Sequence, residues 1–449
     1  MIVQSTEIPR RYQAVTRENI KKLAVWSRLS PELQEAVMVV SAVLPFRTNT
    51  YVIDELIDWD RVPDDPMYQL TFPQRGMLTA RQYDRMAGLV LGGAPREETQ
   101  RAANEIRFQL SPHPAGQLTH NRPYLDGERL DGVQHKYRET VLFFPSQGQT
   151  CHAYCTFCFR WAQFVGISDL RFASREVDKL IRYLKQHPEV SDVLFTGGDP
   201  MVMKARTLAA YIEPLLTPEL EHIRNIRIGT KAVAYWPHRF VSDPDSDEVL
   251  RLFDKIVASG RHLAVMGHYN HPVELSSPIA REAIRRIRAT GANIRMQSPV
   301  VRHVNDDADA WAELWRTGVQ LGMIPYYMFV ERDTGARHYF ELPLVRVWEI
   351  YREAYNQVSG LARNVRGPSM SAFQGKVRIL GVTEIGADPV FILEFLQARQ
   401  PELVRIPFFA RYDPEATWFD QLQPYRESDR PFFEERPKQV LDALVELTA

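Results

Sequence analysis

Three cysteines form the first group of residues in this sequence that could do chemistry. Cys151, Cys155 and Cys158 lie in the stretch CHAYCTFCFR (151–160), and the 449-residue chain has no other cysteine. Thiolates at this spacing, C-x3-C-x2-C, suit soft metal centres. A [4Fe–4S] cluster usually takes four cysteines, so three would leave one iron open to a ligand from outside the chain, which suits catalysis.

Two other uses of these cysteines stay open from the residues alone. A structural zinc site usually has four ligands in two short paired groups, whereas this chain offers one group that His152 or a distant histidine could complete. The thiols could also be unligated. Spacing and context favour a catalytic iron–sulfur cluster.

The cysteines follow TVLFFP (140–145), an apolar run typical of a buried strand that leads into a loop. From about residue 140 to 330, strands of this kind alternate with helical patterns, several of which end in glycine. The strands are expected at 140–145, 190–200, 223–233, 262–272, 292–306 and 323–333, and the helices at 174–188, 206–216, 245–260, 277–291 and 307–322.

Such alternation indicates an α/β fold with parallel strands and right-handed crossovers, in a barrel or an open doubly wound sheet. In both arrangements functional residues gather at the carboxyl ends of the strands. The polar stretches TGGDP, GHYNHP, MQSPVVR and ERD end four of the strands. Each alone is typical of a turn or a structural histidine, but together with the cysteines they predict one site at one rim.

The cysteine motif after the first of six such strands resembles that of radical S-adenosylmethionine (SAM) enzymes. Within that superfamily the chain resembles the lysine 2,3-aminomutase family over about residues 30 to 345, and weakly beyond. The matching segments include HKYRETVLFF, VLFTGGDP, IRIGTKA, GHYNHPVEL, MQSPVVRHVND and PYYMFV. The resemblance implies a partial (β/α)6 TIM-like barrel at 136–345, between a helical N-terminal region (1–135) and a mixed C-terminal region (346–449).

The resemblance also implies the cofactors of a radical SAM enzyme. In that family three cysteines hold a [4Fe–4S] cluster, SAM chelates the open iron, and an electron splits SAM to give a 5′-deoxyadenosyl radical. Cys151, Cys155 and Cys158 match the cluster ligands. The positions that match the SAM turn and the pocket lining are Gly197, Gly198, Asp199, His268, Asn270 and Gln297. A tight turn capped by Asp199 is the plainer reading of TGGDP.

The family further implies pyridoxal 5′-phosphate (PLP), held as an imine by a C-terminal lysine. The candidate is Lys376, where small residues and Gly375 before it would let a ligand approach. Lys136 and Tyr137 match positions that bind the PLP phosphate. The second basic position of the family falls on Thr140, and the extra C-terminal cysteines that hold zinc in some members are missing.

The substrate residues depart from the lysine-specific pattern. Arg160 matches the arginine that grips the substrate α-carboxylate by a bidentate pair. Two aspartates that pair with the far ammonium of lysine fall here on Arg332 and near Ser369. We therefore expect a substrate with an acidic or neutral distal group, unless Glu331 or Asp333 moves in to replace the lost acid.

Composition places few further limits on function. The net charge is −1, and 45% of the residues are hydrophobic, so no partner of the nucleic-acid or membrane class is expected. No signal-like or bilayer-spanning apolar run is visible, and clustered reduced thiols predict a cytoplasmic protein. The resemblance implies a homo-oligomer and a flavodoxin- or ferredoxin-type reductant.

The sequence thus predicts a radical SAM aminomutase that moves an amino group from the α to the β carbon of an amino acid with the help of PLP. The first alternative is a PLP-independent radical SAM enzyme for another rearrangement or an oxidation. The second is a non-enzymatic iron–sulfur or zinc protein.

Overall fold

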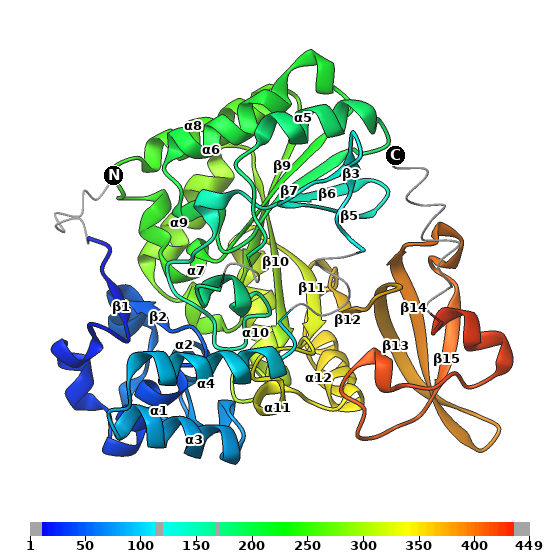
Figure 1. Ribbon diagram of the computed structural model, residues 1–449. Helices are drawn as coiled ribbons and strands as arrows, with labels where there is room; N and C mark the ends of the chain where they lie inside the picture. Colours follow the sequence, from blue (N-terminus) through cyan, green and yellow to red (C-terminus); the bar gives the residue numbers. More distant parts are fainter. Residues whose placement is uncertain (1–10, 113–119, 168–170, 435–449) are drawn as a thin grey trace.

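The computed structural model describes residues 11–112, 120–167 and 171–434, and its centre is a sheet of parallel strands in chain order (Figure 1). The six predicted strands and the five helices between them are all present, so the α/β class is confirmed. The strands are β6 (Thr140–Phe143), β7 (Asp192–Phe195), β8 (Asn225–Thr230), β9 (His262–His268), β10 (Asn293–Val300) and β11 (Ile324–Val330). The helices are α5 (Val177–Gln186), α6 (Ala205–Ile212), α8 (Ser246–Ala258), α9 (Pro278–Ala289) and α10 (Ala308–Gln320).

The order of the strands distinguishes a barrel-like sheet from a doubly wound sheet, the two arrangements that the alternation of strands and helices left open. A doubly wound sheet reverses its strand order at a switch point, whereas β6 to β11 follow one another without reversal. Right-handed crossovers then put the helices on one face and leave the other face free. In the described sheet β6 pairs with β5 (Val133–Tyr137) and β11 with β12 (Arg366–Ser371), so no closed barrel forms, and the partial barrel stays a prediction.

The two faces of the parallel strands differ in burial. On β8, Ile226 and Ile228 point toward the helices and are fully buried, whereas the intervening Arg227 is partly exposed. The same alternation holds in β7, where Val193 and Phe195 are buried. Because successive side chains in a strand point to opposite faces, the partly exposed set lines an open space on the helix-free side.

The described N-terminal region contains four α-helices and lies beside the cysteine loop. A small sheet pairs β1 (Ala14–Thr16) with β2 (Arg47–Asn49). The helices are α1 (Pro31–Val40), α2 (Pro66–Thr71), α3 (Ala80–Leu91) and α4 (Arg96–Gln109), and the hairpin β3 (Tyr124–Leu125) and β4 (Glu128–Arg129) follows.

The C-terminal region continues the same sheet beyond β12. Helix α12 (Leu344–Asn356) precedes β12, and β13 (Gly375–Ile385), β14 (Asp388–Ala398) and β15 (Pro407–Arg411) then add antiparallel strands. Figure 1 shows this extension, in orange, at the side of the parallel strands. The expected region boundaries at residues 135 and 345 fall inside β5 and α12. Each of these two elements therefore continues from one region into the next.

Two short helices complete the described chain, α7 (Ala232–Tyr235) after β8 and α11 (Arg337–Phe340) after β11. Across the three described ranges, no helix combines the length and the apolar character needed to cross a bilayer.

Candidate active site

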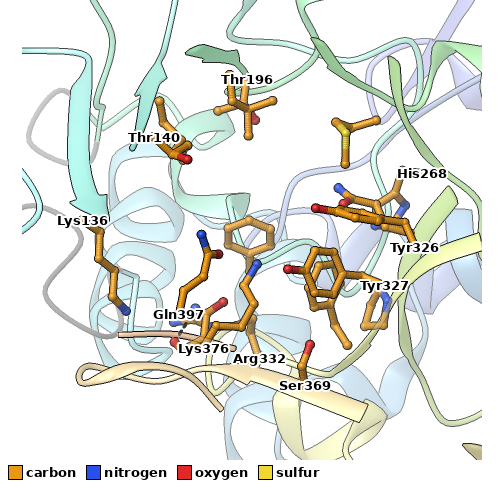
Figure 2. Close-up of a pocket in the computed structure, with 18 of the residues that line it drawn as sticks. Lys136, Thr140, Thr196, His268, Tyr326, Tyr327, Arg332, Ser369, Lys376 and Gln397 are labelled. Carbon is orange, nitrogen blue, oxygen red and sulfur yellow. Dashed lines mark hydrogen bonds between the residues drawn. The ribbon is translucent and has the colours of Figure 1, made fainter. Parts of the chain in front are cut away.

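The inner face of the sheet lines a cavity of about 360 Å³, with walls from β5 to β14 (Figure 2). Seven of the predicted site residues line it: Lys136, Tyr137, Arg160, His268, Gln297, Arg332 and Lys376. The other predicted residues lie outside the lining: Cys151, Cys155, Cys158, Gly197, Gly198, Asp199, Asn270 and Asp333. The cysteine loop still reaches the cavity, because Phe157 and Phe159 belong to its wall.

The cysteine loop has no strand or long helix of its own, and backbone hydrogen bonds from other elements hold it. The amide of Tyr154 donates to the carbonyl of Arg47 in β2 at 2.8 Å. The amide of Thr156 donates to the carbonyl of Leu70 in α2 at 2.9 Å. Within the loop, the Cys158 amide donates to the carbonyl of Cys155 at 3.1 Å. The N-terminal region therefore fixes where the thiols lie.

The three thiols lie close enough to affect one another. Burial raises the pKa of Cys158 to about 12, and the nearby Cys155 raises it further. Burial also raises the pKa of Cys151, with contributions from Asp199, Cys158 and Cys155. Three neighbouring thiolates in a buried site need a positive centre, so the donor set fits a thiolate-bound metal cluster. In the described parts of the chain, no three His, Cys, Asp or Glu side chains meet at the position of a single metal ion.

His152, the nearest histidine in sequence, lies among aromatic rings. Its ring centroid is 5.4 Å from that of Tyr12 and 6.4 Å from that of Trp236. Burial lowers the pKa of His152 to about 3, with smaller contributions from two arginines. This packing gives no support to His152 as the fourth ligand of a Cys3His zinc site.

The turn after β7 lies directly on the cysteine loop. The Asp199 amide donates to the carbonyls of Gly148 at 2.9 Å and Thr150 at 2.7 Å. A Cβ on Gly198 would lie 2.5 Å from the backbone N and O of Thr150. Gly197 has φ +136°, a conformation that favours glycine. The two glycines therefore allow close contact with the cysteine loop, a requirement separate from any contact with SAM.

The Asp199 carboxylate is bonded to the turns after β7 and β8. It accepts hydrogen bonds from the Thr230 hydroxyl at 2.7 Å and from the amides of Met201 and Lys231, each at 2.9 Å. The Ala232 amide donates to it as well, at 3.0 Å. With its oxygens bonded to the turns after β7 and β8, the carboxylate caps both turns and Asp199 positions these loops, while its match to the SAM-binding turn stays a prediction.

A buried ion pair connects the ends of β8 and β9. Lys231 Nζ donates to Glu274 Oε1 at 2.6 Å and to Asn270 Oδ1 at 2.9 Å. The second Glu274 oxygen accepts from the Asn270 amide. Asn270 Nδ2 and His268 Nδ1 are buried without a hydrogen-bond partner among the described residues. Both predicted residues thus keep a polar atom for a ligand.

Lys376 enters the cavity from the antiparallel extension, as Figure 2 shows. Its Nζ lies 4.1 Å from the ring centroid of Tyr327. Burial lowers the pKa of Lys376 to about 8. The sequence suggested that Gly375 leaves room for a ligand. In the structure, a Cβ at this position would lie 2.3 Å from the carbonyl oxygen of Gln397 in β14. That glycine allows β13 to approach β14.

Two guanidinium groups flank the ring of Phe159. The Cζ atom of Arg160 lies 4.8 Å from the ring centroid, and that of Arg332 lies 6.0 Å from it. Arg332 pairs with Asp333 at 3.4 Å, but its Nη2 is buried with no hydrogen-bond partner among the residues described. Burial raises the pKa of the Glu331 carboxyl well above its ordinary value.

Positive charge dominates the cavity. Nearby Arg399, Arg332 and Lys376 add to the effect of burial and lower the pKa of Lys136 well below its ordinary value. At the amino end of the strands, Arg227 pairs with Asp192 at 2.8 Å. Asp192 in turn lies opposite Thr140 in the sheet register.

Two further basic side chains, from other strands, line the same cavity as Thr140. Arg227 comes from β8, and Arg366 of β12 lies with its Cζ 5.1 Å from the ring centroid of Tyr326. Both line the same cavity as Lys136. The arrangement fits an anionic ligand such as a phosphate.

Comparison with known proteins identifies the family. No family model matches the chain. A putative L-lysine 2,3-aminomutase of Aquifex aeolicus is 31% identical over 381 residues, which cover 85% of this chain and 88% of that protein. The chain belongs to the lysine 2,3-aminomutase family. It is therefore an enzyme, of the radical SAM aminomutase type.

Other members of the lysine 2,3-aminomutase family match a shorter part of the chain. The L-lysine 2,3-aminomutase of Haemophilus influenzae is 29% identical over 53% of this chain and 68% of its own length. That of Escherichia coli is 28% identical over 56% and 70%. A radical SAM methyltransferase structure from Sphaerobacter thermophilus matches 65% of this chain and 94% of its own, at 16% identity and a TM-score of 0.37, too low to establish a shared fold.

Several residues of this aminomutase site could not be chosen from the sequence. Lys231 is an exception, because it lies in the family segment IRIGTKA at the end of a predicted strand, and this position could have marked it as a site residue. Tyr235, whose hydroxyl lies 3.4 Å from the sulfur of Cys155, carries no such signal. Arg227 and Arg366 are far apart in sequence and meet only through the fold.

The glycine turn gives a testable prediction about how the cysteine loop is held. Gly198→Ala should lower the free energy of unfolding by about 1–3 kcal/mol, because its Cβ would collide with backbone atoms of Thr150. Urea denaturation followed by tryptophan fluorescence measures the change.

The matched control is Gly88→Ala in α3, where an added Cβ meets nothing within 4 Å. It should leave stability unchanged or raise it by up to about 1 kcal/mol. Equal effects of the two substitutions would show that the turn does not press on the cysteine loop.

Proposed function

We propose that this enzyme uses a [4Fe–4S] cluster, SAM and PLP to move the amino group of an acidic amino acid from the α to the β carbon. One observation carries the proposal. The loop with the three cysteines, the buried Lys376 and the two arginines around Phe159 all belong to one positively charged cavity. The electron donor proposed is a flavodoxin- or ferredoxin-type protein, and the assembly proposed is a homo-oligomer.

The cysteine end of the cavity would hold the cluster and SAM. Cys151, Cys155 and Cys158 would hold the cluster, which when bound supplies the electron that cleaves SAM. His268 and Asn270 have buried polar atoms without a partner in the described chain and would orient the bound SAM. The apolar side chains of Phe157 and Phe159 line the wall between the cysteines and the cavity and would exclude water from a radical.

The other end of the cavity would hold PLP. PLP would supply a π-system that delocalises the unpaired electron during the amino shift. Lys376 has a pKa of about 8 because of burial, so a sizeable neutral fraction is available as a nucleophile at pH 7 to 8. Lys136, Arg227 and Arg366 would neutralise the phosphate.

The charges around Phe159 support an acidic substrate. Arg160 has no carboxylate partner in the part of the chain that the structure describes, and it would take the α-carboxylate. Arg332 has a free Nη2 and would take a second carboxylate. The opposing case needs a free acid for a lysine ammonium, but burial raises the pKa of Glu331 well above its ordinary value and Asp333 already pairs with Arg332.

The first test concerns the cluster. Protein purified anaerobically should contain iron and sulfide and should release 5′-deoxyadenosine from SAM in the presence of dithionite. Cys155→Ala should abolish the release and leave the protein folded, as far-ultraviolet circular dichroism would show. Stoichiometric zinc without iron after anaerobic preparation would refute the cluster.

The second test concerns Lys376. PLP followed by borohydride should modify Lys376, and mass spectrometry of peptides would locate the adduct. Because the pKa of Lys376 is lowered to about 8, labelling should rise from pH 6 to 8 and level off above pH 8, while exposed lysines continue to gain reactivity toward pH 10.

Lys255→Ala is the control for this test, since Lys255 is exposed and pairs with Glu213. It should leave PLP binding unchanged, whereas Lys376→Ala should abolish the adduct. A Lys376→Ala protein with unaltered turnover would remove Lys376 from the site. Full wild-type activity without PLP would favour a PLP-independent radical SAM enzyme.

The third test concerns the substrate. Lysine, glutamate and neutral amino acids should be compared through 5′-deoxyadenosine and β-amino products. Glutamate should be preferred, and Arg332→Ala should lower kcat/KM for it by roughly 10- to 100-fold, the loss of one charge-assisted hydrogen bond of about 1.5–3 kcal/mol. Arg129→Ala on the exposed β4 is the control. Lysine as the best substrate by a wide margin would contradict the assignment of Arg332.

A further inference from the structure

One buried phenol contacts a cysteine of the proposed cluster site. The hydroxyl of Tyr235 lies 3.4 Å from Cys155 Sγ. Tyr235 is 1% exposed, and its hydroxyl makes no other hydrogen bond within the described chain. Of the three sulfurs, Cys155 is the one with a side-chain hydrogen-bonding partner among the described residues.

The position of this phenol is fixed by the backbone. Tyr235 is the last residue of α7, and its amide donates to the carbonyl of Lys231 at 2.8 Å. Its carbonyl accepts from the side chain of Asn49 at 3.0 Å. The hydroxyl is therefore held at the sulfur by both the turn after β8 and the N-terminal region.

A buried cation lies against the same ring. Lys231 Nζ is 4.4 Å from the ring centroid of Tyr235 and pairs with the fully buried Glu274 at 2.6 Å. This ion pair packs against the phenol ring and helps to fix its position beside Cys155.

A thiolate bound to a metal accepts hydrogen bonds, and each such bond favours the state of the cluster with more negative charge. Reduction by one electron adds that charge. A donor at Cys155 therefore makes reduction easier, whereas its removal makes reduction harder. This reasoning rests on the proposed cluster and adds a residue to it that touches neither SAM nor substrate.

We propose that Tyr235 donates a hydrogen bond to the Cys155 sulfur of the cluster and thereby raises its one-electron reduction potential. Tyr235 is a positioning residue, since it acts through the ligand Cys155. Lys231 supports it by packing against the ring as part of its ion pair with Glu274.

The test uses the full chain, reconstituted anaerobically with iron and sulfide, without SAM. Wild type, Tyr235→Phe and Tyr183→Phe are titrated with dithionite and mediators, and electron paramagnetic resonance reports the reduced cluster. Tyr235→Phe should lower the midpoint potential, with a reduction equilibrium constant about tenfold smaller, which is about 59 mV for a one-electron couple. Iron and sulfide per chain should match wild type.

Tyr183→Phe is the matched control. Tyr183 is fully buried in α5, and its hydroxyl bonds to His135 Nδ1 at 2.6 Å. The Tyr183→Phe variant loses a hydrogen bond of a buried tyrosine hydroxyl that is not in contact with the cysteines. The midpoint potential of its cluster should therefore equal that of wild type. An equal shift in both variants would mean a general effect of lost stability and would overturn the proposal.

Two further outcomes are decisive. A Tyr235→Phe protein with a full cluster and an unchanged midpoint overturns this inference alone, whereas wild type without any cluster overturns the proposed function as well. If Tyr235→Phe does not retain the cluster, fluorotyrosines at position 235 take its place. Their stronger O–H donors should raise the potential in order of acidity, and a constant potential across the series would refute the role of Tyr235.

Discussion

The structure of this site depends on the cysteine loop, whose conformation is fixed by hydrogen bonds to other elements. The cysteine loop has neither a ladder nor a long helix, so its shape comes from hydrogen bonds to β2, α2 and the glycine turn after β7. Buried backbone groups need such partners. This requirement explains why a mostly helical N-terminal region lies against an α/β core: it closes the loop from the side that the parallel strands leave open.

A second constraint is charge. The cavity brings together lysines and arginines from β5, β8, β12 and β13 and from the loops after β6 and β11. Of the nearby carboxylates, Asp192 and Asp333 are paired, and burial raises the pKa of Glu331 well above its ordinary value. Buried cations without counter-ions are costly. Anionic ligands would relieve that cost, so binding and folding are coupled in this molecule.

Much of the fold could be read from the sequence because period-two burial and helical spacing are local signals. Strand ends were less predictable. The strand expected at 223–233 ends at Thr230, because Ala232 begins α7, and the one expected at 292–306 ends at Val300, after which His303 adopts φ +70°. Such endings depend on tertiary hydrogen bonds, which spacing does not encode.

For the site, too, local patterns could be read from the sequence, whereas contacts between distant segments could not. The cysteines, the glycine turn and Lys376 carry sequence signals in their spacing or their surroundings. The capping role of Asp199 and the contact between Tyr235 and Cys155 join residues 31 and 80 positions apart. The meeting of Arg227 with Arg366 in one cavity likewise requires the assembled sheet, so no single segment could reveal it.

The ladder between β13 and β14 has one irregularity with a wider consequence. Lys376 lies opposite Gln397, but Val377 lies opposite Phe395, so Leu396 is an extra residue in β14. Gln397 faces the cavity, whereas Phe395 is fully buried away from it. This bulge separates the reactive end of the hairpin from its packing end. Because the bulge absorbs the change in register, Lys376 and Gln397 can face the cavity while Val377 and Phe395 stay buried in the hairpin beyond them.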